Sequence, residues 1–408
     1  MIRRSVRVTA VVFVSVLAAP STGRAQTFKV DKFDIKGDGG TDYVAVESAT
    51  GRVFVSRGTH MMVVEGATGK VLGDIPNTPG VHGAGIATKA GYGFTTNGGD
   101  KTVTMFDAKT LAELKRITVE QGGLDGILYD EPDDLIILTN HSRPIGTLTA
   151  LNPKTGDIVG NVELEDNAPE GAAADGKGHI FVNNETKNTI QVIDIKTWKA
   201  VASWPLDPCK GPTGIAYDKA SDRIFSGCSN TSVVVDPNAS KVVATIKNGT
   251  RVDALGWDPS KKLIYIPNGG EGNVTVVHQD SPDKYTVVDT VATFAGAKTI
   301  CVDPKTHDVP TGAWSGSTSS GQRGSISGEG RRARAWSAGT DYCRVVHRDQ
   351  AVATGRGLLG GTGADEKPYP MNEARRFGRS GSGNRDGAAG VGADRPVQQR
   401  PLQRTVEC

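Results

Sequence analysis

Short apolar runs separated by polar turns recur along the chain between residues 41 and 307. The clearest copy is residues 169–194, PEGAAADGKGHIFVNNETKNTIQVID, where small residues lead to Asp and two apolar runs end in Asn and Asp. The runs are too short for helices, and no extended 3.6-residue apolar period is present. The pattern therefore predicts an all-β protein built from repeated hairpins.

The repeat has a nearly constant length, and seven copies follow one another at intervals of 40–45 residues. Each complete copy predicts four strands, and four short strands in about 42 residues is the size of one β-propeller blade. The main alternative is a β-sandwich, but its strands would not repeat one four-strand sequence pattern at a nearly constant interval. We therefore predict a seven-bladed propeller of four-stranded antiparallel blades over residues 26–307. The residues that close the first strand of each copy are Glu47, Thr88, Asp130, Asp175, Asp218, Asp258 and Asp303.

The two ends of the repeat region predict how the ring closes. Residues 27–37, TFKVDKFDIKG, resemble a fourth strand without the preceding three. We expect them to supply the outer strand of the last blade and so to remove a sheet edge. The last copy begins normally at residues 297–303, but no apolar strand follows residue 307. We therefore expect the seventh blade to lack its two middle strands and to close weakly.

The second strand of each copy carries a resemblance to a known family. FTTN at residues 94–97, ILTN at 137–140, FVNN at 181–184 and YIPN at 265–268 are each followed by a polar turn. In this respect the chain resembles the YVTN-repeat, YncE-like β-propeller family of exported bacterial proteins, over residues 27–307. The resemblance implies a seven-bladed disc with a ligand or partner site at the axial channel, and it implies no particular reaction.

The first 25 residues have the pattern of an export signal. Arg3, Arg4 and Arg7 precede an apolar stretch at residues 8–19, and small residues place a cleavage site before Gln26. A membrane anchor is the competing interpretation, but the stretch is short for a bilayer span. We expect cleavage after residue 25, a periplasmic or secreted protein, and no membrane span in the mature chain. Disulfides form in such compartments.

The composition changes abruptly after residue 307. From residue 311 to 408 the chain contains 14 Arg, 1 Lys and 18 Gly, without a regular apolar period. The two interpretations are a disordered basic arm and a frameshifted translation of GC-rich DNA, and we favour the frameshift. Residues 308–408 are thus expected to lie outside the propeller. A GxGxxG string in this tail has no strand–turn–helix context, and we attribute it to chance.

The charge of the repeat region differs from that of the whole chain, which has a formal net charge of +2. Residues 26–310 contain 28 basic and 36 acidic residues, so this part is acidic. A nucleic-acid groove needs clustered Lys and Arg to displace counterions. The acidic charge of residues 26–310 therefore argues against nucleic acid as a partner. We expect a monomer that binds a protein or a small molecule.

One register position of the repeat predicts the channel mouth. The chain enters the innermost strand five residues before the residue that closes the first strand of each copy. Several copies carry a charged residue at this position. Converging carboxylates raise one another's pKa or hold a cation. We expect a cation or polar-ligand site, with a solvated acidic rim as the other interpretation. The metal candidates are Asp125, Glu170 and Asp253, with Ca²⁺ as the ion if one binds and Lys298 as a neutralising partner. The predicted ligand-binding positions are Asp42, His82, Asp125, Glu170, Thr213, Asp253 and Lys298.

The cysteines and the remaining histidines predict no catalytic centre. Cys209 and Cys228 flank a hairpin of the fifth copy, and we expect a structural disulfide worth about 3 kcal/mol by loop entropy. A redox pair or metal ligands are less favoured, because CxxC spacing and a neighbouring His are lacking. Cys301 is expected to be a lone buried residue. Three histidines follow no metal-binding spacing, and we interpret them as solvated turn residues. They are His60, His141 and His179.

These features favour a protein without enzymatic activity. The serines lack the strand–elbow–helix context of a hydrolase. The leading hypothesis is an exported propeller that binds a partner or ligand on its channel face and needs no cofactor. The alternative, from another functional class, is a Ca²⁺-dependent hydrolase of the lactonase type with acidic residues at the channel mouth.

Overall fold

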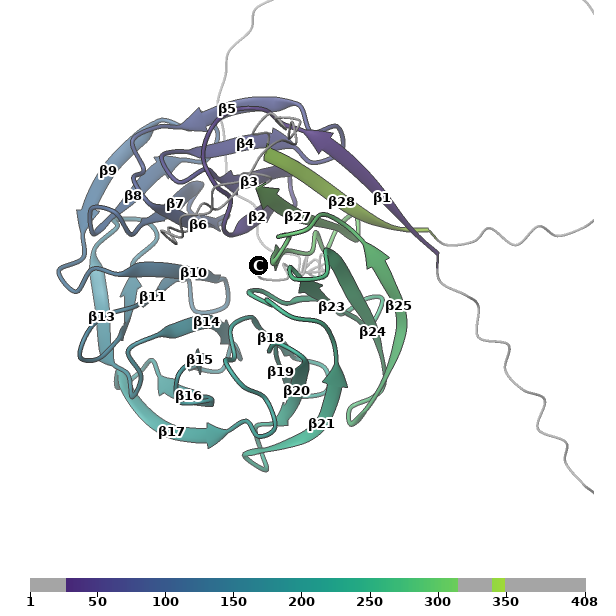
Figure 1. Cartoon of the computed structure of the whole chain (residues 1–408). Helices are drawn as coiled ribbons and strands as arrows, with labels where there is room; N and C mark the ends of the chain where they lie inside the picture. Colours follow the sequence, from purple (N-terminus) through teal and green to yellow (C-terminus); the bar gives the residue numbers. More distant parts are fainter. Residues whose placement is uncertain (1–26, 315–339, 349–408) are drawn as a thin grey trace, which may run out of the picture. The chain divides into compact units, whose positions relative to one another are not determined.

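The computed structural model describes residues 27–314 and 340–348. These residues form strands and no helices, and the strands build seven four-stranded antiparallel sheets in a ring (Figure 1). The protein is therefore a seven-bladed β-propeller, as the repeat predicted. Among the described residues, no helix is long and apolar enough to span a membrane.

In blades 1 to 6 the strands follow the chain from the innermost to the outermost strand. Blade 1 contains β2 (Val44–Glu47), β3 (Arg52–Ser56), β4 (Met61–Glu65) and β5 (Val71–Ile75). Blade 2 contains β6 (Val81–Ala87), β7 (Tyr92–Asn97), β8 (Thr102–Asp107) and β9 (Glu113–Thr118). Blade 3 contains β10 (Leu124–Asp130), β11 (Leu135–Asn140), β12 (Thr147–Leu151) and β13 (Ile158–Glu163).

The next three blades repeat this order. Blade 4 contains β14 (Pro169–Ala174), β15 (His179–Asn184), β16 (Thr189–Asp194) and β17 (Lys199–Pro205). Blade 5 contains β18 (Ile215–Asp218), β19 (Arg223–Ser226), β20 (Thr231–Asp236) and β21 (Lys241–Lys247). Blade 6 contains β22 (Gly256–Asp258), β23 (Leu263–Asn268), β24 (Asn273–Ser281) and β25 (Lys284–Ala292).

Blade 7 is assembled from separate parts of the chain. The N-terminal strand is its outermost strand, so the predicted closure of the ring is confirmed. The expectation that its two middle strands are missing is wrong, because both strands lie beyond residue 307, where the sequence placed the end of the propeller. From the axis outward, its strands are β26 (Thr299–Ile300), β27 (Asp308–Trp314), β28 (Thr340–Arg348) and β1 (Thr27–Asp34).

Side chains on β28 fix this strand between its neighbours. The guanidinium of Arg344 lies 2.8 Å from the Asp31 carboxylate on β1 and 3.0 Å from the Asp308 carboxylate on β27. Tyr342 is fully buried and stacks on Phe33 with ring centroids 5.7 Å apart. Arg344, which the sequence pattern assigns to a basic tail, thus neutralises carboxylates on two strands that are far apart in the sequence.

Three sequence-based expectations lie outside the described residues. They are the cleaved signal at residues 1–25, the disordered or frameshifted nature of residues 315–339 and 349–408, and the GxGxxG string of Gly355, Gly357 and Gly360.

A buried Asn at the end of the second strand ties that strand to the third. In blade 3, Asn140 Nδ2 donates hydrogen bonds of 2.8 Å to the hydroxyls of Thr147 and Thr149. Asn97 and Asn268 make equivalent contacts in blades 2 and 6. Because a buried amide without partners is costly, this pairing explains why Asn recurs at this position of the repeat.

The apolar core lies between neighbouring blades. Phe225 of blade 5 packs on Trp257 of blade 6 with ring centroids 4.9 Å apart. Closer to the axis there is room only for small residues, since a Cβ atom at Gly214 would lie 2.2 Å from the backbone of Ala254. The small residues of the innermost strands therefore permit the blades to converge.

Blade 5 contains the predicted Cys209–Cys228 disulfide, with a Cα–Cα distance of 5.8 Å and both residues buried. This prediction is confirmed. Cys301, expected to be a lone buried residue, is also disulfide-bonded, so that expectation is wrong. It rested on setting aside the part of the chain after residue 307.

Candidate functional site

A charged cavity of about 340 Å³ opens where the innermost strands converge. Six of the seven predicted ligand-binding positions line it, and every blade except blade 5 contributes a charged side chain. That these residues bind a ligand stays a prediction. The charged lining residues, in chain order, are Asp42, His82, Asp125, His141, Glu170, Asp253 and Lys298.

The repeat register brings these side chains to one end of the innermost strands. His82, Asp125 and Glu170 are each the second residue of an innermost strand, in β6, β10 and β14. Asp42 and Lys298 lie shortly before β2 and β26, on the same side of the ring. Blades 1, 2, 3, 4 and 7 therefore each present a side chain to the same cavity from this end of the innermost strand.

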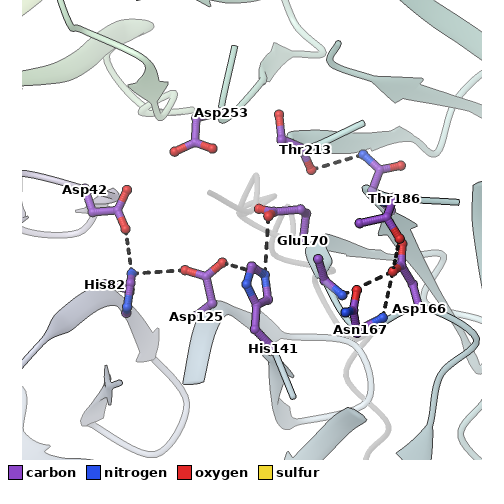
Figure 2. A network of polar contacts seen from close by, with 12 residues as sticks. Asp42, His82, Asp125, His141, Asp166, Asn167, Glu170, Thr186, Thr213 and Asp253 are labelled. Carbon is purple, nitrogen blue, oxygen red and sulfur yellow. Dashed lines mark hydrogen bonds and ion pairs between the residues drawn. The ribbon is translucent and has the colours of Figure 1, made fainter. Parts of the chain in front are cut away.

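Five side chains alternate between acid and base across blades 1 to 4 (Figure 2). His82 Nδ1 lies 2.6 Å from Asp42 Oδ2 and 3.1 Å from Asp125 Oδ1. The other oxygen of Asp125, Oδ2, lies 3.2 Å from His141 Nε2, which is also 3.3 Å from Glu170 Oε1. Asp125 thus holds one histidine with each of its oxygens.

Two further charged residues, Asp253 and Lys298, join the cluster from blades 6 and 7. Lys298 Nζ contacts the Asp253 carboxylate and lies 3.1 Å from Asp42 Oδ1. Burial acts to lower the pKa of Lys298, but the charges of Asp253 and Asp42 outweigh it and raise that pKa well above its usual value. Lys298 therefore carries a positive charge at neutral pH and neutralises this side of the cavity, as predicted.

The carboxylates determine the charge of the two histidines. Burial acts to lower the pKa of both imidazoles, but it is outweighed in each case. Hydrogen bonds and charges from Asp125 and Asp42 raise the pKa of His82 to about 10, and Asp125 and Glu170 raise that of His141 to about 10. Without a metal ion, both rings are imidazolium ions at neutral pH.

The same contacts move the two central carboxyl groups in opposite directions. Burial acts to raise the pKa of Asp125, but its two histidine partners outweigh this effect and hold that pKa well below its usual range. Burial raises the pKa of Glu170 to about 7, since His141 only partly offsets it and the charges of Asp125 and Asp253 add to it. Glu170 therefore changes its protonation near neutral pH.

A glycine makes room for the ring of His82. A Cβ atom at Gly98 would lie 2.9 Å from His82 Nε2 and 2.9 Å from the carbonyl oxygen of Leu124. A side chain at residue 98 would therefore require a shift of the His82 ring or of the backbone at Leu124.

Thr213 is the predicted position that does not line the cavity. Its hydroxyl donates a 2.9 Å hydrogen bond to the carbonyl oxygen of Val252, which links blade 5 to blade 6. The small, neutral side chain finds a backbone partner where the other positions carry charges, so its role in the structure is to hold blades together.

Two polar side chains that line the cavity were missed from the sequence. His141, interpreted as a solvated turn residue, is instead paired with two carboxylates, so that interpretation is wrong. It directly follows Asn140 at the end of β11, the same register as Gly98 after Asn97 in β7. Aligning the copies on this Asn would have placed His141 beside the cavity. Tyr43 follows Asp42 and donates a 3.4 Å hydrogen bond to Glu170.

The mixed set of nitrogen and oxygen atoms forms two groups with the spacing of metal ligands. In each group, one ligand atom per residue lies within 4.8 Å of the others. The first group is Asp42, His82 and Asp125, and the second is Asp125, His141 and Glu170. Asp253, a predicted metal candidate, belongs to neither group and pairs with Lys298 instead.

A neighbouring buried carboxylate, Asp166, has partners of another kind. It accepts hydrogen bonds from the backbone N–H groups of Asn167 at 2.6 Å and Ala168 at 3.2 Å. It also accepts hydrogen bonds from the backbone N–H groups of Thr186 at 2.7 Å and Lys187 at 3.0 Å. These donors connect the loop before β14 to the turn after β15 (Figure 2).

Comparison with known proteins identifies the fold. No protein-family model matches the chain, and no curated protein matches its sequence. The RRP9 WD40 repeats superpose with a TM-score of 0.64 at 12% identity, over 79% of this chain and 97% of that one. A chain of a mitotic checkpoint complex gives 0.62 at 14% identity, over 75% and 95%. The propeller has WD40-like structural neighbours. A chain of Kuenenia stuttgartiensis hydrazine synthase is also similar, with 0.59 at 14% identity over 68% and 93%.

Proposed function

We propose that the protein is a non-enzymatic binding scaffold that holds a partner protein or a polar ligand at the channel face of the propeller. The observation that carries this proposal is the convergence of charged side chains from six blades on one cavity of about 340 Å³. Taking so many ionisable groups out of water costs free energy that even paired charges need not recover. A cluster of this kind is more easily explained by binding than by stability.

The charge of the cavity defines what it accepts. Four carboxylates face one lysine and two histidines, so the fully ionised cluster carries one excess negative charge. A cationic or hydrogen-bond-donating group is therefore the complementary occupant. One structural neighbour is a chain of a mitotic checkpoint complex, which favours a protein as the partner.

The resemblance to the YVTN-repeat, YncE-like family extends the proposal to the location of the protein. We propose that residues 1–25 direct export and that the mature chain works as a monomer in the periplasm or outside the cell. Export and oxidation would suit the Cys209–Cys228 disulfide.

The test compares a channel variant with a matched surface variant. The full chain, Asp125→Asn/Glu170→Gln and Asp207→Asn/Glu120→Gln would each serve as bait in an extract of the source organism, with recovered proteins and small molecules quantified by mass spectrometry. We expect an occupant that the wild type and the surface variant retain and the channel variant loses. Equal recovery by all three proteins would overturn the proposal.

A metal-dependent hydrolase of the lactonase type is the second candidate. The observation that favours it is the pair of nearly buried carboxylates, since the side chains of Asp125 and Glu170 are 11% and 8% exposed. Ca²⁺ prefers oxygen ligands of this kind. Calorimetry with Ca²⁺, followed by a lactone-hydrolysis assay of the loaded protein, tests this candidate. Absence of Ca²⁺ binding by the wild type would exclude it.

A further inference from the structure

The group Asp125, His141 and Glu170 has the composition of a transition-metal site. It offers one imidazole nitrogen and two carboxylates, and its atoms come from neighbouring blades 3 and 4. Imidazole with carboxylate suits Zn²⁺ and related ions, whereas Ca²⁺ takes oxygen ligands almost exclusively. We infer that the channel mouth binds one divalent transition-metal ion of the Zn²⁺ type through Asp125, His141 and Glu170.

The separations of His141 Nε2 from the two carboxylate oxygens fit one ion. Ligands at about 2.0–2.2 Å from a metal lie roughly 2.8–3.6 Å from one another in octahedral and tetrahedral geometry. His141 Nε2 lies 3.2 Å from the Asp125 oxygen and 3.3 Å from the Glu170 oxygen. Both separations from the nitrogen therefore suit a shared ion, and all three ligand atoms lie within 4.8 Å of one another.

The orientation of His141 is a second, independent observation. Its Nε2 atom is buried, yet it has no partner with hydrogen-bond geometry, although both carboxylate oxygens are close. Both contacts are therefore ion pairs by distance that lack the geometry of a direct hydrogen bond. This orientation suits a nitrogen that shares a third partner with the two oxygens.

The other group, Asp42, His82 and Asp125, is less suited to an ion. Lys298 Nζ lies 3.1 Å from Asp42 Oδ1, and its positive charge opposes a second cation there. His82 instead holds Asp125 Oδ1 at 3.1 Å and fixes the direction of the other oxygen. We assign His82 as a positioning residue behind the ligand Asp125, a type of support that changes metal affinity by about 10–100-fold.

The inference rests on the proposed function of the channel face as a binding site. The EDTA-treated full chain would be titrated with ZnCl₂, and separately with CaCl₂, by calorimetry. We expect one Zn²⁺ per chain and no Ca²⁺. His141→Gln and Asp125→Asn should weaken Zn²⁺ binding at least 100-fold, and His82→Gln by about 10–100-fold. Asp207→Asn/Glu120→Gln is the control and should bind as the wild type does.

A spectroscopic measurement separates direct ligation from loss of folding. Co²⁺ in place of Zn²⁺ reports its ligands through visible absorption, and the spectrum should change shape in His141→Gln but only lose intensity at subsaturating Co²⁺ in His82→Gln. If His141→Gln does not fold, Glu170→Gln carries the same test with a smaller change. Zn²⁺ binding that is absent in the wild type, or unchanged in the ligand variants, overturns the inference. If partner recovery still depends on Asp125 and Glu170 in that case, the proposed binding function stands.

Discussion

Asp166 and Glu170 are four residues apart, both buried in the same part of the propeller, and their surroundings differ in kind. Asp166 accepts hydrogen bonds of 2.6–3.2 Å from backbone N–H groups. These donors do not titrate, and they are fixed in place by the main chain. Glu170 faces His141 at 3.3 Å and Tyr43 at 3.4 Å, and both partners are ionisable side chains. Figure 2 shows the two carboxylates in one view.

The difference is expressed in the pKa values of the two groups. Burial acts to raise the pKa of Asp166, but the donors from Thr186 and the neighbouring backbone outweigh it and lower that pKa. For Glu170 burial prevails and raises the pKa to about 7. A buried carboxylate satisfied by backbone donors is thus part of the scaffold, whereas one left to ionisable partners is available for a ligand.

The largest expected effect is the loss of Asp166. Asp166→Ala removes the buried carboxylate that four part-buried backbone N–H groups share as an acceptor, which should destabilise the protein by roughly 3 kcal/mol. Urea unfolding at pH 7 measures the change, with Asp207→Ala as the exposed control. A change as small as that of the control would show that Asp166 is not structural and would remove the contrast with Glu170.

The pH dependence of stability sharpens the contrast at the histidines. The pKa of His82 is about 10 in the folded protein, against about 6.5 in an unfolded chain. Because the folded state binds the proton more tightly, the stabilisation is complete below pH 6.5 and is lost as the pH rises towards 10. His82→Gln, compared with metal-free wild type by urea unfolding, should therefore be least stable relative to it at pH 6 and approach it at pH 10. A constant difference would contradict the charged state of His82.

The repeat allowed part of this site to be predicted. Asp125 and Glu170 follow from register alone, because every copy of the repeat points the same position at the axis. His141 requires a second register, the residue after the Asn that ends the second strand. Gly98 and Gly269 occupy that position in other blades, so His141 looks like one more turn residue until the strands are closed into a ring.

The closing blade could be predicted only at its outer edge. The isolated strand β1 indicated a missing partner, since a lone strand must add to a sheet. Its partner β28 has no such signal, because Arg344 and Tyr342 acquire partners only when strands from both ends of the chain meet. The same non-local pairing explains why the pKa of Glu170, set partly by Asp253 from blade 6, could not be read from the sequence.

The smallest expected effect is that of Glu170→Gln. At pH 4.5 the carboxyl group is protonated in the folded protein, so the amide should change stability by no more than about 1 kcal/mol. The raised pKa means that wild-type stability falls as the pH rises from 4.5 through about 7, and the variant should gain on the wild type over that interval. Unfolding curves at pH 4.5, 6 and 8 measure the trend. A loss as large as that of Asp166→Ala would make Glu170 part of the scaffold.

The central claim is that the channel mouth is built for an occupant, with Asp125, His141 and Glu170 at its centre. Anomalous diffraction at the zinc edge, from crystals grown with ZnCl₂, tests this claim most directly. We predict one strong peak within ligand distance of the nearest oxygens of Asp125 and Glu170 and of His141 Nε2, and none in crystals of His141→Gln. A zinc peak elsewhere with none at the channel mouth, in a crystal whose packing leaves the cavity open, would contradict the claim.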